Sequence, residues 1–148
     1  MARTTEITIK PNRREKGMRM IRLGSLAGYP FDGPRLLAGW PPPKSAAVYA
    51  ITYKPDPAKD QHAVIYVAHS DDLSVERLPF KHPMASSWVK RAGSRWKLYI
   101  CTYEIPGDTP LHREQITREL ISIYHPGCNI QQYDPTWKPE WIAGSDSV

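Results

Sequence analysis

The chain has 148 residues, of which 41% are hydrophobic and 24% are charged. This length suits one domain that buries a core without disulfide staples, and it excludes two full enzymatic domains. No apolar run approaches the roughly 18 residues that cross a bilayer, and the N-terminus lacks the apolar core of a secretory signal. The two cysteines, Cys101 and Cys128, do not form the pattern of a disulfide framework. We therefore expect a cytoplasmic protein with no membrane-spanning segment.

Basic residues outnumber acidic ones, with 20 Lys and Arg against 15 Asp and Glu and a net charge of +5, which favours a polyanionic partner. Residues 1–23 are rich in Lys and Arg and predict a basic N-terminal arm. A second basic stretch, between Glu76 and Glu104, contains no acid and several aromatic residues. Its candidate nucleic-acid-binding residues are Lys81, Lys90, Arg91, Arg95 and Lys97. The alternative is a solvated face with ordinary amphipathic aromatic residues.

The core elements begin after a Gly- and Pro-rich segment at residues 24–44, which we expect to be a covering loop. Residues 47–53 are dense in β-branched and aromatic side chains and predict a strand that ends at a polar turn over residues 54–60. Residues 63–68 repeat this composition directly after the turn. The two runs therefore predict an antiparallel hairpin.

Short helices are expected after the hairpin. Ser70 or Asp71 can cap a helical turn that carries Glu76 and Arg77. Residues 83–92 predict a second short helix, which the following glycine ends.

Residues 97–105 predict a third strand, and residues 110–124 predict the longest helix, which ends at a Pro-Gly pair. Apolar positions in this helix recur at spacings of three and four and form one buried stripe. They are Ile116, Leu120, Ile123 and Tyr124. The fold class is therefore α+β, a small three-stranded antiparallel sheet flanked by helices over residues 45–130, followed by a polar C-terminal tail at residues 131–148.

An ordered set of short motifs spans the same region. They are Ala47-Val48-Tyr49, Tyr66-Val67-Ala68, Arg77-Leu78, Glu119-Leu120-Ile121 and Tyr124-His125-Pro126-Gly127-Cys128-Asn129. Each piece is common by itself, but their order and spacing over residues 45–130 resemble the GIY-YIG nuclease domain. Ala47 and Ala68 stand where that family usually has glycine, so close approach of the backbone to a ligand would be partly screened by methyl groups.

The resemblance implies metal-dependent hydrolysis of DNA phosphodiesters. The residues at or near the family's catalytic positions are Tyr49, Tyr66, His69, Arg77, His82 and Asn129. A tyrosine whose pKa is lowered by a nearby cation can take a proton from water, and a guanidinium can hold a phosphate whose charge grows in the transition state. The family's single glutamate holds one divalent cation, so Mg²⁺ or Mn²⁺ is the expected cofactor. For the two tyrosines, the alternative role is cross-strand packing.

Several carboxylates are candidates to hold this cation. When we count back from the end of the last helix, the family's glutamate position is Thr117. Glu114 lies about one helical turn earlier on the same face, so it is the preferred substitute ligand. Glu119 becomes the ligand if the alignment slides by two residues, and Glu76 could also turn toward the cleft. The alternative for Glu114 and Glu119 is solvent-facing ion pairing with neighbouring arginines.

Different classes of function remain open from these observations. The first is a stand-alone endonuclease acting on DNA, for which a homodimer would suit the cutting of both strands. The second is a nucleic-acid or protein binding module that kept the fold and lost the chemistry, and the third is a small regulatory domain without a nucleic-acid partner. The chain has no Gly-rich motif that would cradle phosphates, so no nucleotide cofactor is expected.

Overall fold

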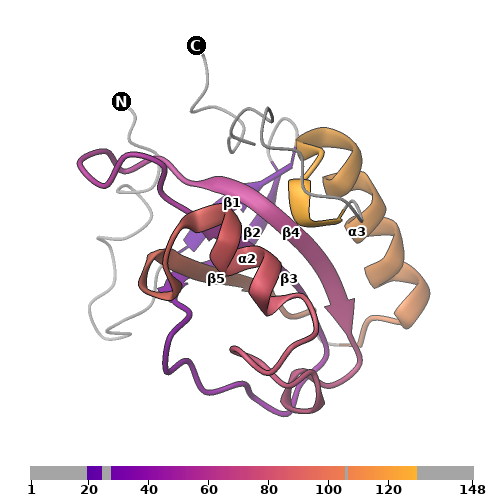
Figure 1. The fold of residues 1–148 in the computed structure, drawn as a ribbon. Helices are drawn as coiled ribbons and strands as arrows, with labels where there is room; N and C mark the ends of the chain where they lie inside the picture. Colours follow the sequence, from indigo (N-terminus) through magenta and orange to yellow (C-terminus); the bar gives the residue numbers. More distant parts are fainter. Residues whose placement is uncertain (1–19, 25–27, 106, 130–148) are drawn as a thin grey trace, which may run out of the picture.

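The structure of the chain is a computed structural model that describes residues 20–24, 28–105 and 107–129. The strands are β1 (Met20–Leu23), β2 (Tyr29–Leu36), β3 (Ala47–Tyr53), β4 (Ala63–Ser70) and β5 (Leu98–Tyr103). The helices are α2 (Ala85–Ala92) and α3 (Pro110–Tyr124), and the single 3₁₀ turns are η2 (Leu73–Val75), η3 (Arg95–Lys97) and η4 (Gly127–Asn129). The strands form one antiparallel sheet in the order β1-β2-β5-β3-β4. In Figure 1, α2 lies in front of this sheet and α3 runs beside β4.

The sheet is built around β3, which pairs with β4 on one side and β5 on the other. Residues 47–52 of β3 are all buried, because both faces of the sheet are covered at this strand. The predicted antiparallel hairpin is confirmed, with β4 extending two residues beyond the expected end. The third predicted strand is also confirmed, as β5.

The prediction of three strands is wrong, because β1 and β2 extend the sheet to five. Both strands come from the segments predicted to be a basic arm and a covering loop. Proline and glycine interrupt β2, which reads Tyr-Pro-Phe-Asp-Gly-Pro-Arg-Leu and shifts register between Asp32 and Arg35, so the strand pattern is hidden in the sequence. At Gly33, with φ of 120°, a Cβ would lie 2.7 Å from the carbonyl oxygen of Ile100. The glycine therefore permits the close approach of β2 to β5.

The helices predicted at residues 83–92 and 110–124 are confirmed as α2 and α3. α3 has the expected bounds, and its N-terminus is capped by Thr109, whose hydroxyl oxygen accepts a hydrogen bond from the backbone N–H of His112 at 3.1 Å. α2 begins at Ala85 and is followed by Gly93 in the left-handed conformation, as expected of a helix terminator. In the described part of the chain, no helix has the length and apolar character needed to cross a membrane. Residues 1–19 of the arm and 131–148 of the tail lie outside the described residues.

The helical turn expected to carry Glu76 and Arg77 is shorter than predicted. It spans only Leu73–Val75, and Asp72 caps it by accepting a hydrogen bond from the backbone N–H of Ser74 at 2.9 Å. Glu76 is the residue that ends the turn, and Arg77 follows in the left-handed conformation with φ of 67°. Both side chains therefore project from an irregular segment rather than from a helix face.

Two hydrophobic cores lie on opposite faces of the sheet. The core on the α2 face contains Trp88 from the helix together with Tyr49 and Ile51 from β3. The core on the α3 face contains Ile116, Leu120 and Tyr124 together with Val48 and Ala50 from β3. Alternate residues of β3 thus supply alternate cores, as the period of two in a strand requires.

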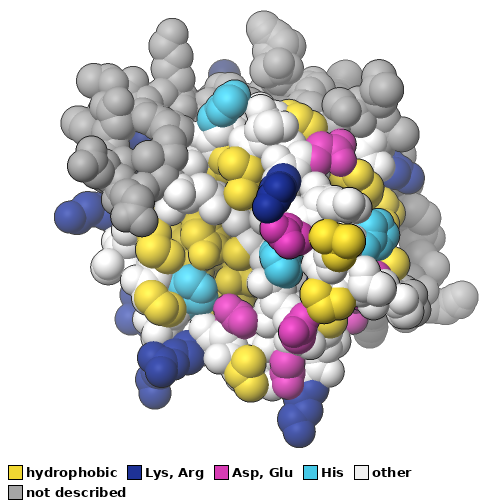
Figure 2. Space-filling model, turned by 90° about the vertical axis from the view of Figure 1, so that its right-hand side faces the viewer, with side chains coloured by type: hydrophobic (Ala, Val, Ile, Leu, Met, Phe, Trp, Pro, Cys, Tyr) yellow, Lys and Arg dark blue, Asp and Glu magenta, His cyan; other side chains and the backbone are white. Residues whose placement is uncertain are grey.

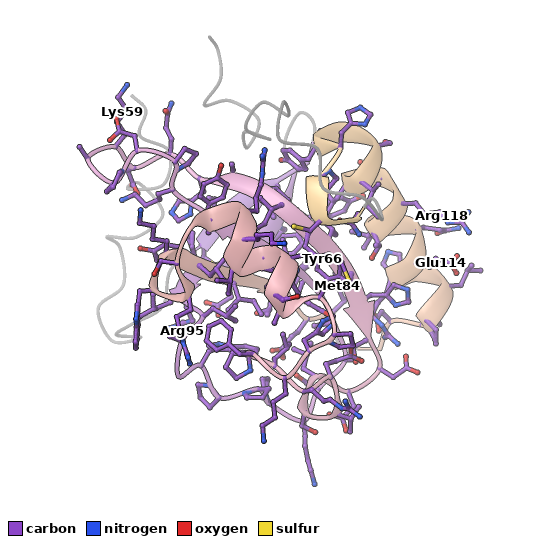
Figure 3. All side chains as sticks on the ribbon, in the orientation of Figure 1. Lys59, Tyr66, Met84, Arg95, Glu114 and Arg118 are labelled. Carbon is purple, nitrogen blue, oxygen red and sulfur yellow. The ribbon has the colours of Figure 1, made fainter. Side chains whose placement is uncertain are left out.

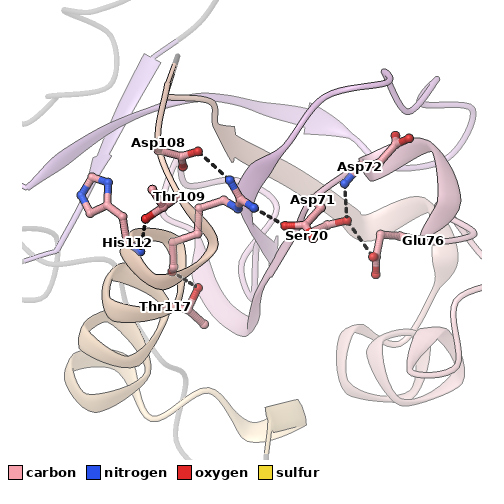
Figure 4. Close-up of polar contacts among 9 residues, drawn as sticks. Ser70, Asp71, Asp72, Glu76, Asp108, Thr109, His112 and Thr117 are labelled. Carbon is pink, nitrogen blue, oxygen red and sulfur yellow. Dashed lines mark hydrogen bonds and ion pairs between the residues drawn. The ribbon is translucent and has the colours of Figure 1, made fainter.

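A buried arginine ties α3 to the end of β4 (Figure 4). The guanidinium of Arg113 forms ion pairs with Asp71, which directly follows β4, and with Asp108, at 2.5 Å. The side chains of Arg113 and Asp108 are each only 4% exposed. Because a buried charge without its partner is costly, this cluster fixes where α3 packs against the sheet.

Replacement of Arg113 with alanine should destabilise the fold by about 3–5 kcal/mol, since it leaves the carboxylate of Asp108 buried without its ion-pair partner. Arg118→Ala on the same helix should cost less than about 1 kcal/mol, because the ion pair of Arg118 with Glu114 is exposed. Chemical denaturation of the two variants measures both effects. Equal losses in the two variants would show that the Arg113 cluster does not hold the helix.

Candidate active site

Two tyrosines from neighbouring strands meet on the α2 face of the sheet. Tyr49 of β3 pairs with Ala68 of β4, and Tyr66 lies two residues from Ala68 along β4, so all three side chains share this face. The ring centroids of Tyr49 and Tyr66 are 6.2 Å apart. Tyr49 is buried and Tyr66 is half-buried, which leaves Tyr66 as the ring that a ligand can reach.

His82 joins the tyrosine pair through a hydrogen bond. Its Nε2 lies 3.2 Å from the hydroxyl of Tyr49, and its Nδ1 accepts a hydrogen bond from the backbone N–H of Met84 at 3.0 Å. In the neutral imidazole only one nitrogen carries a proton, so this arrangement requires an Nε2–H that donates to Tyr49. The imidazole also packs against the indole of Trp88, with ring centroids 4.8 Å apart. The histidine is therefore fixed in one tautomer and one orientation.

The pKa values of the two tyrosines are shifted by different sets of interactions. Burial raises the pKa of Tyr49, and the charges of Tyr66 and Glu76 raise it further. Burial and the charge of Glu76 also raise the pKa of Tyr66, but its hydrogen bond with Tyr49 lowers it. Burial lowers the pKa of His82, although the charge of Glu76 acts in the opposite direction. Tyr66 is therefore the better placed of the two phenols to lose a proton.

Glu76 is the carboxylate that faces this cluster. Its charge acts on the pKa of both tyrosines and of His82, and its Oε2 accepts a hydrogen bond from the Ser70 hydroxyl at 2.7 Å. Figure 4 shows this contact at the end of β4. The second carboxylate oxygen has no hydrogen-bond donor among the residues that the structure describes. Glu76 can therefore accept a further ligand next to the tyrosines.

Arg77 follows Glu76 and its side chain is exposed. Its positive φ of 67° is uncommon for a residue with a side chain, and such conformations cluster at functional sites. Within the described residues, no hydrogen bond or ion pair engages its guanidinium. The guanidinium is therefore available to bind an anion.

The structure does not bring His69 to the tyrosines. His69 pairs with Val48, whereas Tyr49 pairs with the neighbouring Ala68. Side chains on adjacent positions of a strand point to opposite faces, so His69 faces α3 and Tyr66 faces α2. The thickness of the sheet separates the two predicted site residues.

The predicted metal ligands on α3 also lie apart from the tyrosines. Glu114 forms an exposed ion pair with Arg118 at 2.6 Å, and Figure 3 shows both side chains pointing away from Tyr66. Glu119 accepts a hydrogen bond from the hydroxyl of Tyr29 at 2.6 Å. This hydrogen bond is the largest of the effects that raise the pKa of Tyr29 to about 12. No group of three His, Cys, Asp or Glu residues that could hold a metal is found in the described ranges.

Thr117, the position predicted for a metal-binding glutamate, does not reach the cluster through its hydroxyl. This side chain is buried and donates a hydrogen bond to the backbone carbonyl of Arg113 at 2.8 Å. The helix packs its stripe of Ile116 and Leu120 into the core on the α3 face. Helical periodicity identifies this stripe but does not tell which face of the sheet receives it, so the sequence alone could not place Thr117.

Asn129 has a structural role at the edge of the sheet. Its side-chain oxygen accepts a hydrogen bond from the backbone N–H of Val67 at 2.8 Å, and its side-chain nitrogen donates one to the carbonyl of the same residue at 2.9 Å. Because β4 is an edge strand, these two bonds replace those that a further strand would make. The expected hydrogen-bonding asparagine thus holds the strand that carries Tyr66.

The predicted nucleic-acid-binding residues lie on α2, on η3 and in the segment before α2. Lys81, Lys90, Arg95 and Lys97 are exposed, and Arg91 is half-buried. Figure 2 shows another face, the right-hand side of Figure 1 where α3 lies, and there Asp, Glu and His side chains gather near the centre around one Lys or Arg side chain.

Comparison of the chain with protein-family models, with curated proteins and with solved structures gives no match. The site is therefore defined by the geometry of Tyr49, Tyr66, His82 and Glu76 alone. Sequence reasoning missed Ser70 as the partner of Glu76, although the period of two along β4 places Ser70 on the same face as Tyr66. It also missed the indole of Trp88 as the surface that fixes His82, because the contact joins α2 to the preceding loop and has no sequence signal.

The lowered pKa of His82 predicts a pH-dependent stability. Below about pH 6.5 the unfolded chain binds a proton at this residue while the folded chain does not, so stability falls as the pH drops from there through the folded-state pKa. His82→Gln removes this contribution, and the variant should lose less unfolding free energy than the wild type between about pH 7 and about pH 5. Urea denaturation at a series of pH values measures the difference. If the free energy of unfolding of the two proteins changes with pH in parallel, a neutral His82 in the folded state is contradicted.

Proposed function

We propose that the chain is a divalent-metal-dependent endonuclease that hydrolyses DNA phosphodiesters in the manner of the GIY-YIG family. The observation that carries this proposal is the meeting of Tyr49 and Tyr66 with His82 and Glu76 on one face of the sheet. Ordinary cross-strand packing would explain the two rings, but not the oriented histidine and the carboxylate beside them. Arg77, the residue after Glu76 in the chain, adds an exposed cation.

In the proposed mechanism Tyr66 is the proton acceptor. His82 donates to the hydroxyl of Tyr49, and the hydrogen bond between Tyr49 and Tyr66 opposes the rise in the pKa of Tyr66 that burial and Glu76 cause. This chain of contacts directs hydrogen-bond donation toward Tyr66 and stabilises its phenolate, which takes a proton from the attacking water. The guanidinium of Arg77 binds the phosphate oxygens, whose negative charge grows in the transition state.

Glu76 is the residue we propose to hold the cation. Mg²⁺ and Mn²⁺ prefer oxygen ligands, and Mg²⁺ is commonly held by one or two carboxylates with water and substrate phosphate completing its shell. Glu76 fits this requirement because one of its oxygens is held by Ser70 and it lies close enough to affect the pKa of both tyrosines. A bound divalent cation would supply the positive charge that lowers the pKa of Tyr66 and polarises the scissile phosphate.

The second candidate function is a DNA-binding module without hydrolysis. It is favoured by the distribution of carboxylates, since Glu114 and Glu119 are engaged elsewhere and Thr117 is buried against the backbone of Arg113. In that case Glu76 does not bind a cation, and the buried tyrosines serve packing. Metal binding therefore separates the two functions more sharply than DNA binding does.

The wild type should cleave plasmid or linear DNA in the presence of Mg²⁺ or Mn²⁺, and Tyr66→Phe should lower the rate at least about 100-fold by removing the proton acceptor. Isothermal titration with Mn²⁺ should give a single-site signal that Glu76→Gln abolishes. Glu114→Gln is the matched control and should leave both readouts unchanged, because its ion pair with Arg118 lies away from the tyrosines. DNA binding without cleavage and without a Mn²⁺ signal would favour the binding module instead.

A further inference from the structure

An exposed tryptophan forms one wall of a hollow at the end of the sheet away from α3. Trp96 in η3 is 64% exposed. The hollow has a volume of about 100 Å³ and is lined by Lys54, Pro57, Trp96, Lys97 and Tyr99. It therefore combines two aromatic side chains with two lysines, and no acid lines it.

The strand register brings these residues together. Tyr53 at the end of β3 pairs with Leu98 at the start of β5, so Lys54 and Lys97 extend from adjacent strands. Asp56, the nearest acid in the turn that follows Lys54, accepts a hydrogen bond from the backbone N–H of Ala58 at 3.0 Å. The two lysines thus give the hollow a positive edge.

The backbone that carries Trp96 and the ring of Tyr99 are held in place by their neighbours. Ser94 caps η3 by accepting a hydrogen bond from the backbone N–H of Trp96 at 3.1 Å. The ring of Tyr99 meets the ring of His62 edge-on at 4.9 Å, and His62 is buried with its Nδ1 3.0 Å from the hydroxyl of Thr52. A ligand that enters the hollow therefore meets a Tyr99 ring that is already ordered by the fold, which lowers the entropy cost of binding.

A row of planar groups runs from the hollow to Phe80, which packs against the core on the α2 face. The guanidinium of Arg95 lies 5.6 Å from the centre of the Trp96 ring and 4.6 Å from that of Phe80. Phe80 precedes His82 by two residues. In Figure 3, Arg95 lies on the side of the molecule opposite Glu114 and Arg118, with Tyr66 between them. A strand bound at Tyr66 could thus continue along this row to Trp96.

We propose that the hollow binds an unpaired base of a single-stranded DNA segment that flanks the phosphate bound at the tyrosines. The base stacks on Trp96, and Lys54 and Lys97 bind the adjoining phosphates. Stacking of this kind is tolerant of sequence and requires a base whose face is free, which a duplex does not offer in its interior. An apolar peptide would leave both lysines without a counter-charge. This inference rests on the proposed function in taking DNA as the partner, but it does not require hydrolysis.

The test measures binding of a fluorescent thymidine oligonucleotide of about 12 residues and of a duplex of the same length by anisotropy, in EDTA so that cleavage cannot contribute. Trp96→Ala should weaken binding of the single strand about 5- to 150-fold, the equivalent of one lost base stack, and should affect the duplex much less. Trp96→Phe should retain part of the affinity. Leu111→Ala is the matched control, since Leu111 is 63% exposed but lies on α3, and it should bind like the wild type.

Unchanged binding of the single strand by Trp96→Ala, or an equal loss for single strand and duplex, would overturn the inference while leaving the proposed function intact. Failure of the wild type to bind either nucleic acid would overturn both. If the wild type does not cleave DNA, but Trp96→Ala selectively loses affinity for the single strand, the stacking site is supported and only the hydrolysis is rejected. Thermal unfolding of each variant confirms that the exposed position has not altered the fold.

Discussion

The register between β3 and β4 decides which side chains meet in this molecule. A slip of one residue would send Tyr66 to the α3 face and bring His69 to the α2 face, because strand side chains alternate. A register shift between Ile51 and Thr52 leaves Ile65 without a direct partner, and both Ile65 and Tyr66 then face the α2 core. The pairing is maintained at the outer edge by Asn129, which binds both backbone groups of Val67. Among the described residues, the side chain of Asn129 thus closes the outer edge of the strand that carries Tyr66.

The same register sets an electrostatic constraint. Tyr49 and Tyr66 are placed in a poorly solvated layer next to a carboxylate, and both conditions disfavour a phenolate. Tyrosines that only pack can remain neutral in this environment. For Tyr66 to accept a proton near neutral pH, a positive charge must lie close to its hydroxyl. No Lys or Arg that the structure describes is among the groups that shift the pKa of Tyr66, and a cation on Glu76 would supply this charge. The chemistry we propose thus depends on the binding of a divalent cation at Glu76.

Much of the fold could be predicted from the sequence where local signals agree. The strand at residues 47–53 and the helix at residues 110–124 have unbroken composition or periodicity, and Gly93 marks a helix end. β1 and β2 could not be predicted, because the latter contains two prolines and Gly33, and its pairing with β5 depends on a contact distant in sequence. The spatial arrangement of the candidate site residues was predicted in part. Alternation along β3 and β4 brings the tyrosines together, whereas the positions of Glu114 and Glu119 depend on which face of the sheet receives α3.

The central claim is that Glu76 holds a divalent cation beside Tyr49 and Tyr66. Paramagnetic broadening of NMR signals by Mn²⁺ tests it directly, because the effect reports proximity to the ion whether or not DNA is cleaved. The account expects the ring signals of Tyr49, Tyr66 and His82 to broaden at low Mn²⁺ concentration, and this broadening to vanish in Glu76→Gln. Broadening centred on Glu114 or Glu119 of α3, or none at the tyrosines, would contradict it.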